Sequence, residues 1–325
     1  MRNGLVLSCL GFVLTATVGA ASRSWELREG GRWQEVASPA TRPVKDETLD
    51  QVEDLIHSRQ YSAAHKLVVG WLADHPSSPV RDRGLYLLGE INFRDGDRIL
   101  AFYNFDELLD RHPGGAYAYA ALERQYDIAD AYLSGRRDSF LGLRIIARKD
   151  EAIEMLWRIQ QRAPGSPVAE KALLRTADHY DDSQENELAA DAYAAYVRAY
   201  PRSPNVPRVR LKRAFAVLRE FRGAKFSATP LIDAKQQLID LRAAYPDLAQ
   251  KENVDAVLIE LDEMLAAKGV QTGDFYRRTH EPRAAAYWYA YVIRTYPGTA
   301  QAARAREALE DIPAAQRTPT TSSAQ

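Results

Sequence analysis

The chain has 325 residues, with 43 basic and 44 acidic side chains and a formal net charge of −1. This balance gives no support to a nucleic-acid-binding or anionic-membrane role based on bulk charge. The only cysteine is Cys9, so the chain beyond it has no disulfide, thiol chemistry or cysteine-based metal site.

Residues 1–20 have the pattern of a secretory signal peptide. Arg2 forms a short positive region, residues 5–18 are mostly apolar, and Val18-Gly19-Ala20 provides small residues for cleavage. One alternative is an uncleaved membrane anchor, although this apolar stretch is short for a bilayer and is interrupted by polar residues. Lipidation at Cys9 is a second alternative, although the apolar run continues past it.

Residues 21–47 form a leader that lies outside the repeats that follow. The segment WELREGGRWQEV predicts a small hairpin across Gly30-Gly31, with Trp25 and Trp33 either exposed or folded back. A flexible leader is the alternative. The SPATRPV segment after it is typical of a linker, and the polar, proline-bearing residues 312–325 predict a disordered tail.

Residues 48–311 repeat one pattern, in which an alanine is followed twelve residues later by a proline. The six pairs are Ala64/Pro76, Ala101/Pro113, Ala152/Pro164, Ala189/Pro201, Ala234/Pro246 and Ala285/Pro297. The residues four and seven positions after each alanine are apolar or aromatic, so all three share one helix stripe. Proline then ends the helix. This is the second half of a tetratricopeptide (TPR) repeat, and it predicts an all-α solenoid of helical hairpins, a right-handed superhelix of about six repeats.

The intervals between these prolines are unequal, which indicates insertions in some units. One insertion near residues 136–149 falls between the two helices of the third hairpin. Residues 221–230, FRGAKFSATP, read as a loop that opens the fifth unit.

The sequence offers no catalytic, cofactor-binding or metal-binding constellation. The six histidines are scattered, and HExxH, GxGxxG, GxxxxGK[ST] and GxSxG motifs are all missing. The acidic segment DDSQENE at residues 181–187 lacks the glycine and the distal glutamate of a calcium loop, so it reads as an inter-helix turn. We therefore expect a protein that is not an enzyme.

Two segments are candidate contact surfaces for a partner. The insertion GRRDSFLGLRIIARK combines basic and apolar residues, including Phe140 and Arg144, and could dock on a partner or lie at a lipid headgroup layer. Alternatively, its apolar residues fold back onto the repeats. Further on, Arg208, Lys212 and Arg219 share one helix face and could attract acidic segments of a partner. The alternative is a solvated face neutralised by acids on neighbouring helices.

The order of these parts resembles the BamD-like outer-membrane assembly factors. The resemblance is carried by YSAAHKLVVGWLADHPSSP, by LYLLGEINFRDGDRILAFYNFDELLDRHPGG and above all by the C-terminal FYRRTHEPRAAAYWYAYVIRTYPGTA. It implies a periplasmic protein at the inner face of the outer membrane, with no catalytic residues. It also implies a barrel-inserting outer-membrane protein as partner and unfolded β-barrel substrates bound in the N-terminal repeats. Another periplasmic TPR adaptor, for example of cell-wall or envelope-constriction machinery, remains the alternative.

Overall fold

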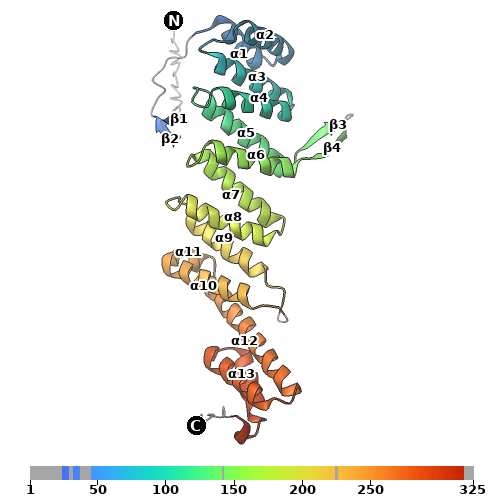
Figure 1. Ribbon diagram of the computed structural model, residues 1–325, viewed down its shortest axis with the longest axis vertical. Helices are drawn as coiled ribbons and strands as arrows, with labels where there is room; N and C mark the ends of the chain where they lie inside the picture. The colour runs from blue at the N-terminus through green and yellow to red at the C-terminus, as the bar shows by residue number, and fades with distance from the viewer. Residues whose placement is uncertain (1–23, 29–31, 37–44, 141–142, 224–225, 318–325) are drawn as a thin grey trace, which may run out of the picture.

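The computed structural model describes residues 24–28, 32–36, 45–140, 143–223 and 226–317, and it forms a long stack of helical hairpins (Figure 1). Fourteen α-helices account for most of these residues. The fold is therefore the all-α helical-hairpin solenoid that the repeated pattern predicts. The predicted signal peptide at residues 1–20 lies outside the described residues, as do residues 37–44 of the predicted linker.

Six hairpins follow one another along the stack. The first three are α1 (Glu47–His57) with α2 (Tyr61–Asp74), α3 (Arg81–Asp95) with α4 (Arg98–Arg111), and α5 (Ala118–Leu133) with α6 (Lys149–Arg162). The next are α7 (Pro167–Asp182) with α8 (Asn186–Ala199), α9 (Val206–Arg219) with α10 (Thr229–Ala244), and α12 (Val254–Arg278) with α13 (Pro282–Thr295). The short helix α11 (Pro246–Lys251) lies between hairpins five and six, and α14 (Ala300–Glu310) packs after them.

The second helix of each hairpin buries the stripe that the sequence marks. Every alanine of the six pairs is fully buried, and both apolar residues that follow it on the stripe are buried as well. Each second helix ends two residues before its proline, for example at Asp74 before Pro76 and at Thr295 before Pro297. The proline, which cannot donate a backbone hydrogen bond, thus sets the length of every second helix.

Side-chain caps fix where several helices begin. Asp46, Asp97, Ser166 and Thr299 each accept a hydrogen bond from the backbone N–H three residues ahead, at 3.0–3.2 Å. Each bond satisfies one of the donors that a helix N-terminus leaves unpaired. Gly96 ends α3 in the left-handed conformation, with φ at 108°. At these four helix starts and at the end of α3, the residue at the cap therefore encodes the turn locally.

Buried residues form three clusters that follow one another along the stack, so the described residues do not share one central core. At two crossings a glycine of the first helix lets an aromatic ring come close. A Cβ at Gly89 would lie 2.4 Å from the Phe105 ring, and one at Gly273 would lie 2.6 Å from the Tyr289 ring. In hairpin four the same register holds Ala177, so only some crossings need the closest approach.

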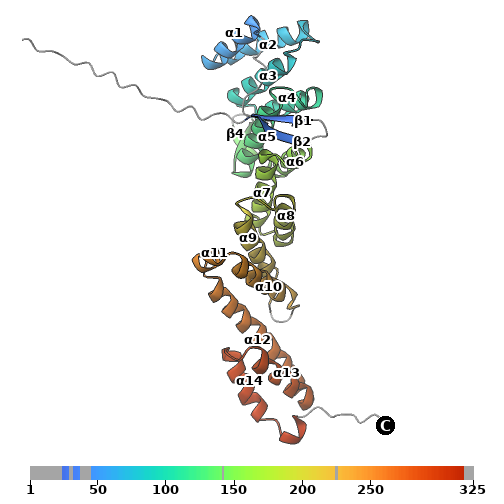
Figure 2. The ribbon, with the colours of Figure 1, turned by 90° about the vertical axis from the view of Figure 1, so that its left-hand side faces the viewer.

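The N-terminal leader forms the small hairpin that the sequence predicts. Strand β1 (Ser24–Arg28) pairs antiparallel with β2 (Arg32–Val36), and the hairpin lies against the start of α5 (Figure 2). The Trp25 and Trp33 rings lie 6.0 and 5.7 Å from the Tyr119 ring. The Trp33 indole N–H donates to the Arg162 carbonyl oxygen at 3.3 Å. These contacts attach the leader to the third hairpin, far along the chain from its own position.

The insertion of the third hairpin also forms two strands. Strand β3 (Arg137–Phe140) and strand β4 (Leu143–Ala147) pair antiparallel between α5 and α6, with a bulge next to Asp138. This second hairpin projects from the stack on the side away from β1 and β2 (Figures 1 and 2). The two strand pairs therefore lie near the opposite ends of helix α5.

The C-terminal end is packed further than the sequence predicts. The disordered tail was expected from residue 312, but Ile312 is buried and Ala314–Gln316 form a single 3₁₀ turn, η1. The Arg317 guanidinium donates to the Glu310 carbonyl oxygen at 2.8 Å. An apolar contact and an end-of-helix bond thus extend the ordered chain to Arg317, which composition alone does not reveal. Among the described helices, none combines the length and the apolar character needed to cross a membrane.

Candidate partner-binding surface

The first helices of the hairpins carry an acidic residue at a common register. In four hairpins it lies eleven residues before the alanine of the second-helix stripe; these acids are Glu53, Glu90, Asp178 and Asp274. In hairpin three, where the insertion lengthens the spacing, Asp130 of α5 follows the buried Ala129 as Glu90 follows Gly89. Helix α9 contains no acidic residue, so hairpin five breaks the series.

Each of these five acids binds a basic side chain of a later helix. The pairs are Glu53–Arg83 at 2.9 Å, Glu90–Arg124, Asp130–Arg175 at 2.5 Å, Asp178–Lys212 at 2.8 Å and Asp274–Arg304 at 2.8 Å. We call this set the ion-pair ladder. Because the acid always precedes its base in the chain, the ladder joins each hairpin from α1 to α9 to the next one.

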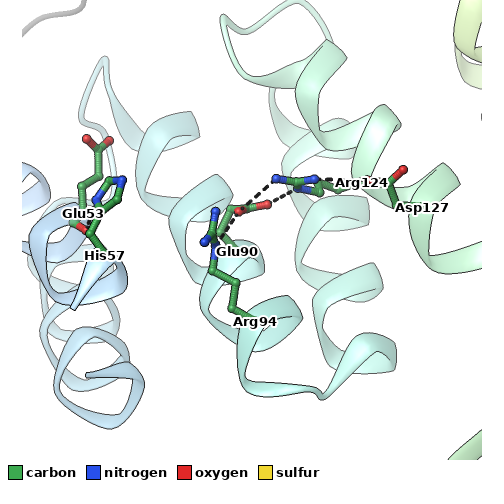
Figure 3. A network of polar contacts seen from close by, with 6 residues as sticks. All are labelled: Glu53, His57, Glu90, Arg94, Arg124 and Asp127. Atoms are coloured by element: carbon green, nitrogen blue, oxygen red, sulfur yellow. Dashed lines mark hydrogen bonds and ion pairs between the residues drawn. The ribbon is translucent and has the colours of Figure 1, made fainter. Parts of the chain in front are cut away.

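Hairpin two contains the most buried acid of the ladder. The Glu90 side chain is 6% exposed and lies between Arg94, at 3.1 Å, and Arg124 (Figure 3). Arg124 also binds Asp127 at 3.1 Å. Burial alone lowers the pKa of Arg124, but its bonds to Glu90 outweigh this effect and raise it. Burial and the Glu90 charge raise the pKa of Tyr86 to about 12.

Hairpin one places two acids opposite a buried arginine of hairpin two. The Arg83 side chain is 7% exposed, and its guanidinium lies 2.6 Å from Asp50 and 2.9 Å from Glu53. Burial lowers the pKa of Arg83, and the hydrogen bonds to both carboxylates more than compensate, so the pKa is raised. At this interface the arginine is buried while both carboxylates stay partly exposed, and the pairs join α1 to α3.

Hairpins four and six add a tyrosine hydroxyl to the acid. Tyr193 donates to Asp178 at 2.8 Å, and Tyr289 donates to Asp274 at 2.6 Å. Burial, followed by the bond to Asp178, raises the pKa of Tyr193. Burial, followed by the bond to Asp274, raises the pKa of Tyr289 to about 12. Both tyrosines therefore stay protonated and act as donors at neutral pH.

The surface beside Asp178 is hollowed. A depression of about 340 Å³ lies between α5, α7, α8 and α9, and its lining residues are Asp130, Ser134, Arg175, Asp178, Asp181, Asp182, Tyr193 and Lys212. Two ladder pairs line it, Asp130–Arg175 and Asp178–Lys212, whereas Asp182 is exposed. This is a polar recess on the first-helix face, which we define as the surface formed by α1, α3, α5, α7 and α9.

The structure gives the predicted α9 stripe a different electrostatic setting. Lys212 is paired with Asp178, while Arg219 is paired with Asp181 and donates to the Asn186 side chain at 3.1 Å. Arg208 is exposed near the start of α9 and takes part in no ion pair within the described residues. Acids of α7 thus neutralise the charges of Lys212 and Arg219, as the alternative interpretation of this face expected.

Acids of neighbouring helices also lie on the other side of α9. A second depression, of about 430 Å³, lies between α8, α9 and α10 and is lined by the carboxylates Glu187, Asp191, Glu220 and Asp233. Burial and these neighbouring charges raise the pKa of Glu220. Helices α8 and α10 thus bring carboxylates beside Arg213 of α9.

Phe140 and Arg144, the other predicted contact residues, lie elsewhere. Both belong to the β3–β4 hairpin, where Phe140 pairs with Leu143 and Arg144 pairs with Ser139. The structure does not bring them together with the α9 stripe, which is two hairpins further along the stack. The two predicted surfaces are thus separate.

The sequence analysis missed the ladder, although its signal is present. Glu90 precedes Arg124 by 34 residues, and Asp178 precedes Lys212 by the same 34 residues. This is about the length of one TPR repeat. An acid followed one repeat later by a base therefore marks contacts between successive hairpins. Within the described residues, no group of three or more histidine, cysteine, aspartate or glutamate side chains is arranged to hold a metal ion.

The helical hairpins, the alanine stripe and the closing prolines define a tetratricopeptide-type repeat protein. Residues 147–322 match the sequence profile of YfiO, described as an outer membrane lipoprotein family. Because this match spans more than half of the chain, the protein belongs to the YfiO outer membrane lipoprotein family. The membership confirms the resemblance to BamD-like factors. No functionally curated protein matches the chain.

Solved structures with the same kind of fold are only distantly similar. The C-terminal part of a TPR repeat-containing protein from Cytophaga hutchinsonii is 15% identical, with a TM-score of 0.38; the match covers 79% of this chain and 86% of that one. A tetratricopeptide repeat protein from Parabacteroides merdae is 16% identical, with a TM-score of 0.35 and coverage of 81% and 96%. PilF of Pseudomonas aeruginosa is 13% identical, with a TM-score of 0.31 and coverage of 81% and 96%.

Proposed function

We propose that this protein is a non-enzymatic periplasmic scaffold that takes part in outer-membrane β-barrel assembly and binds protein partners over its superhelical surface. The observation that carries the proposal is the family match, which runs from the end of β4 to beyond α14. The fold supports a binding role, because a stack of hairpins presents a long surface relative to its volume.

We propose residues 1–20 as the signal that exports the chain, with the solenoid at residues 48–311 as the working part at the inner face of the outer membrane. N-terminal sequencing of the protein isolated from the envelope tests the first half of this statement. A mature chain that begins near Ala21 is the expected result. A chain that retains residues 1–20 would contradict cleavage.

The first-helix face is the surface that we assign to partner contact. Its ladder charges are already paired, so they hold the hairpins in register, while exposed groups beside them remain open to a partner. Arg208 lies one helical turn before Lys212 on α9, and Lys212 lines the recess next to Asp178. A partner segment with an acidic group would bind Arg208 most strongly, because that guanidinium has no competing carboxylate within the described residues.

Depletion of the protein tests the proposed role directly. The expected result is a lower level of folded, heat-modifiable outer-membrane barrels, with the barrel-inserting protein recovered in pull-downs. Normal barrel levels after depletion would reject the barrel-assembly role. Recovery of peptidoglycan enzymes in place of barrel proteins would instead assign the scaffold to cell-wall or envelope-constriction machinery.

The contact surface is tested by charge reversal at Arg208. The variant Arg208→Glu should recover less of the partner while the thermal unfolding temperature stays unchanged, because the side chain is exposed. Arg198→Glu, at an exposed position of α8, is the matched control and should recover the partner normally. Equal recovery by both variants would remove α9 from the contact surface.

A further inference from the structure

The β1–β2 hairpin of the leader lies on hairpin three as a bound ligand would, although the chain continues from it into hairpin one. Strand β2 ends at Val36 and helix α1 begins at Glu47, whereas the strands contact α5 and α6 (Figure 2). The two strands form a sheet of their own. Because a lone two-stranded hairpin is only marginally stable in water, the leader owes its order to the surface of hairpin three.

The strand register gives this small sheet one apolar face. Leu27 lies directly opposite Trp33, and Trp25 precedes Leu27 by two residues, so the three side chains point to the same side. Trp33 is buried, and Trp25 and Leu27 are partly buried against the helical core. Gln34, on the other face, is exposed. Docking on hairpin three therefore covers the apolar face of the leader.

Hairpin three offers a site built for an indole ring. The Tyr119 ring supplies an aromatic surface, and its hydroxyl is held by the backbone N–H of Val168 at the start of α7. Arg162 is the last residue of α6, so its carbonyl oxygen has no partner within that helix and accepts the Trp33 indole N–H at 3.3 Å. The Arg162 guanidinium is itself held by Asp106 at 2.8 Å. The ring and the acceptor are thus fixed by the helical stack.

We propose that this surface is a binding site for β-hairpins with tryptophan on one face, that the leader fills it in cis, and that a tryptophan-bearing hairpin of a partner protein displaces the leader. Tryptophan fits because phenylalanine would leave the Arg162 carbonyl without a donor. The chain between Val36 and Lys45 tethers the leader at an effective concentration on the order of millimolar, so the site stays closed until a competitor binds. The inference rests on the proposed function only for the existence of a protein partner.

A fluorescent peptide of residues 23–37 tests the site in trans, with binding followed by anisotropy. It should bind the full chain that carries Trp25→Ala with Trp33→Ala, because the leader of that variant cannot dock. It should bind the unaltered protein more weakly by about ten-fold or more, because the tethered leader competes. A peptide with Trp33→Phe should bind the double variant about ten-fold more weakly than the unaltered peptide, since it lacks the indole donor.

Substitutions in the helices separate this site from general apolar adhesion. Tyr119→Ala, added to the double variant, should abolish binding of the peptide because it removes the aromatic surface. Tyr103→Ala is the matched control, since that tyrosine is 59% exposed on α4, and it should leave binding of the peptide unchanged. Circular dichroism should report the same helix content in both variants.

Hydrogen exchange tests the same idea on the unaltered protein, without any substitution. Amides of β1 and β2 should exchange faster than those of α5 and α6, because the leader undocks while the helices stay folded. Equal protection of the leader and α5 would make the leader a permanent part of hairpin three and overturn the proposal. So would a peptide that fails to bind the double variant, or that binds it no more tightly than the unaltered protein. Neither measurement depends on barrel levels after depletion, so this inference and the proposed function fail independently.

Discussion

Hairpins two and four solve the same structural problem in different ways. Both carry an acid at the ladder register and a base 34 residues later, but Glu90 is 6% exposed while Asp178 is 30% exposed. Glu90 is held by two arginines, whereas Asp178 is held by a lysine and the Tyr193 hydroxyl. The acid at this register can thus lie in a buried cluster of charges, or in a more exposed ion pair that also accepts a bond from a neutral hydroxyl. The two arrangements should contribute differently to the free energy of unfolding.

The largest expected difference lies in the ion pairs themselves. Arg124→Met leaves the buried Glu90 with Arg94 alone and should reduce the free energy of unfolding by about 3 kcal/mol. Lys212→Met removes the base from the more exposed pair and should reduce the free energy of unfolding by less than about 1 kcal/mol. Methionine keeps much of the side-chain volume and the helix propensity in both variants. Chemical denaturation measures both, and equal losses would show that burial does not separate the two hairpins.

The helix crossings provide the next test. Gly89→Ala places a methyl group against the Phe105 ring and should destabilise the protein by about 1–2 kcal/mol, because overpacking exceeds the gain in helix propensity. Gly70→Ala is the matched control, since α2 offers open space there, and it should stabilise by up to about 1 kcal/mol.

In hairpin four, the equivalent change runs in the opposite direction. Ala177→Gly should cost about 1 kcal/mol from helix propensity alone. A Gly89→Ala variant as stable as Gly70→Ala would mean that the close approach of α3 and α4 is not needed.

The tyrosines sharpen the comparison at high pH. The pKa of Tyr86 is raised from 10.0 to about 12, so its neutral form is favoured in the folded state. Its contribution is therefore complete below pH 10 and is lost as the pH rises towards 12. Tyr86→Phe should flatten the loss of stability in this range, as followed by denaturation at successive pH values. An unchanged slope would exclude Tyr86 as its source.

A smaller effect is expected at neutral pH in hairpin four. Tyr193→Phe removes the hydroxyl that donates to Asp178 and should cost about 1 kcal/mol, since Asp178 keeps Lys212. Thermal unfolding of Tyr193→Phe beside Tyr289→Phe, which loses the equivalent bond to Asp274, shows whether the two hairpins behave alike. No change in either variant would assign the tyrosines to packing alone.

The repeat could be predicted from sequence because its signals are local. Ala101, Phe105 and Leu108 share a stripe within one helix, and Pro113 ends that helix, so the pattern specifies the second helix without reference to any other part of the chain. The insertion at residues 136–149 was also placed between the correct helices, because it interrupts the register.

The surface could not be predicted in the same way, because its charges are set by neighbours in space. Lys212 and Arg219 look like part of a basic run until α7 brings Asp178 and Asp181 beside them. The docking of Trp33 on the third hairpin joins positions 129 residues apart, and no local pattern encodes it. Reading acids and bases one repeat apart would have recovered the ladder, but not that contact.

The direction of the ladder has a consequence for how such a chain changes length. Because each early hairpin offers a carboxylate forward and a cation backward, removing hairpin two as a unit would place Glu53 next to Arg124 and restore a matched joint. Duplication of a unit would likewise create a joint with complementary charges. Between α1 and α9, adding or removing a whole hairpin therefore keeps an acid opposite a base at each new contact. This no longer holds after α9, because that helix has no carboxylate to pair with the next hairpin.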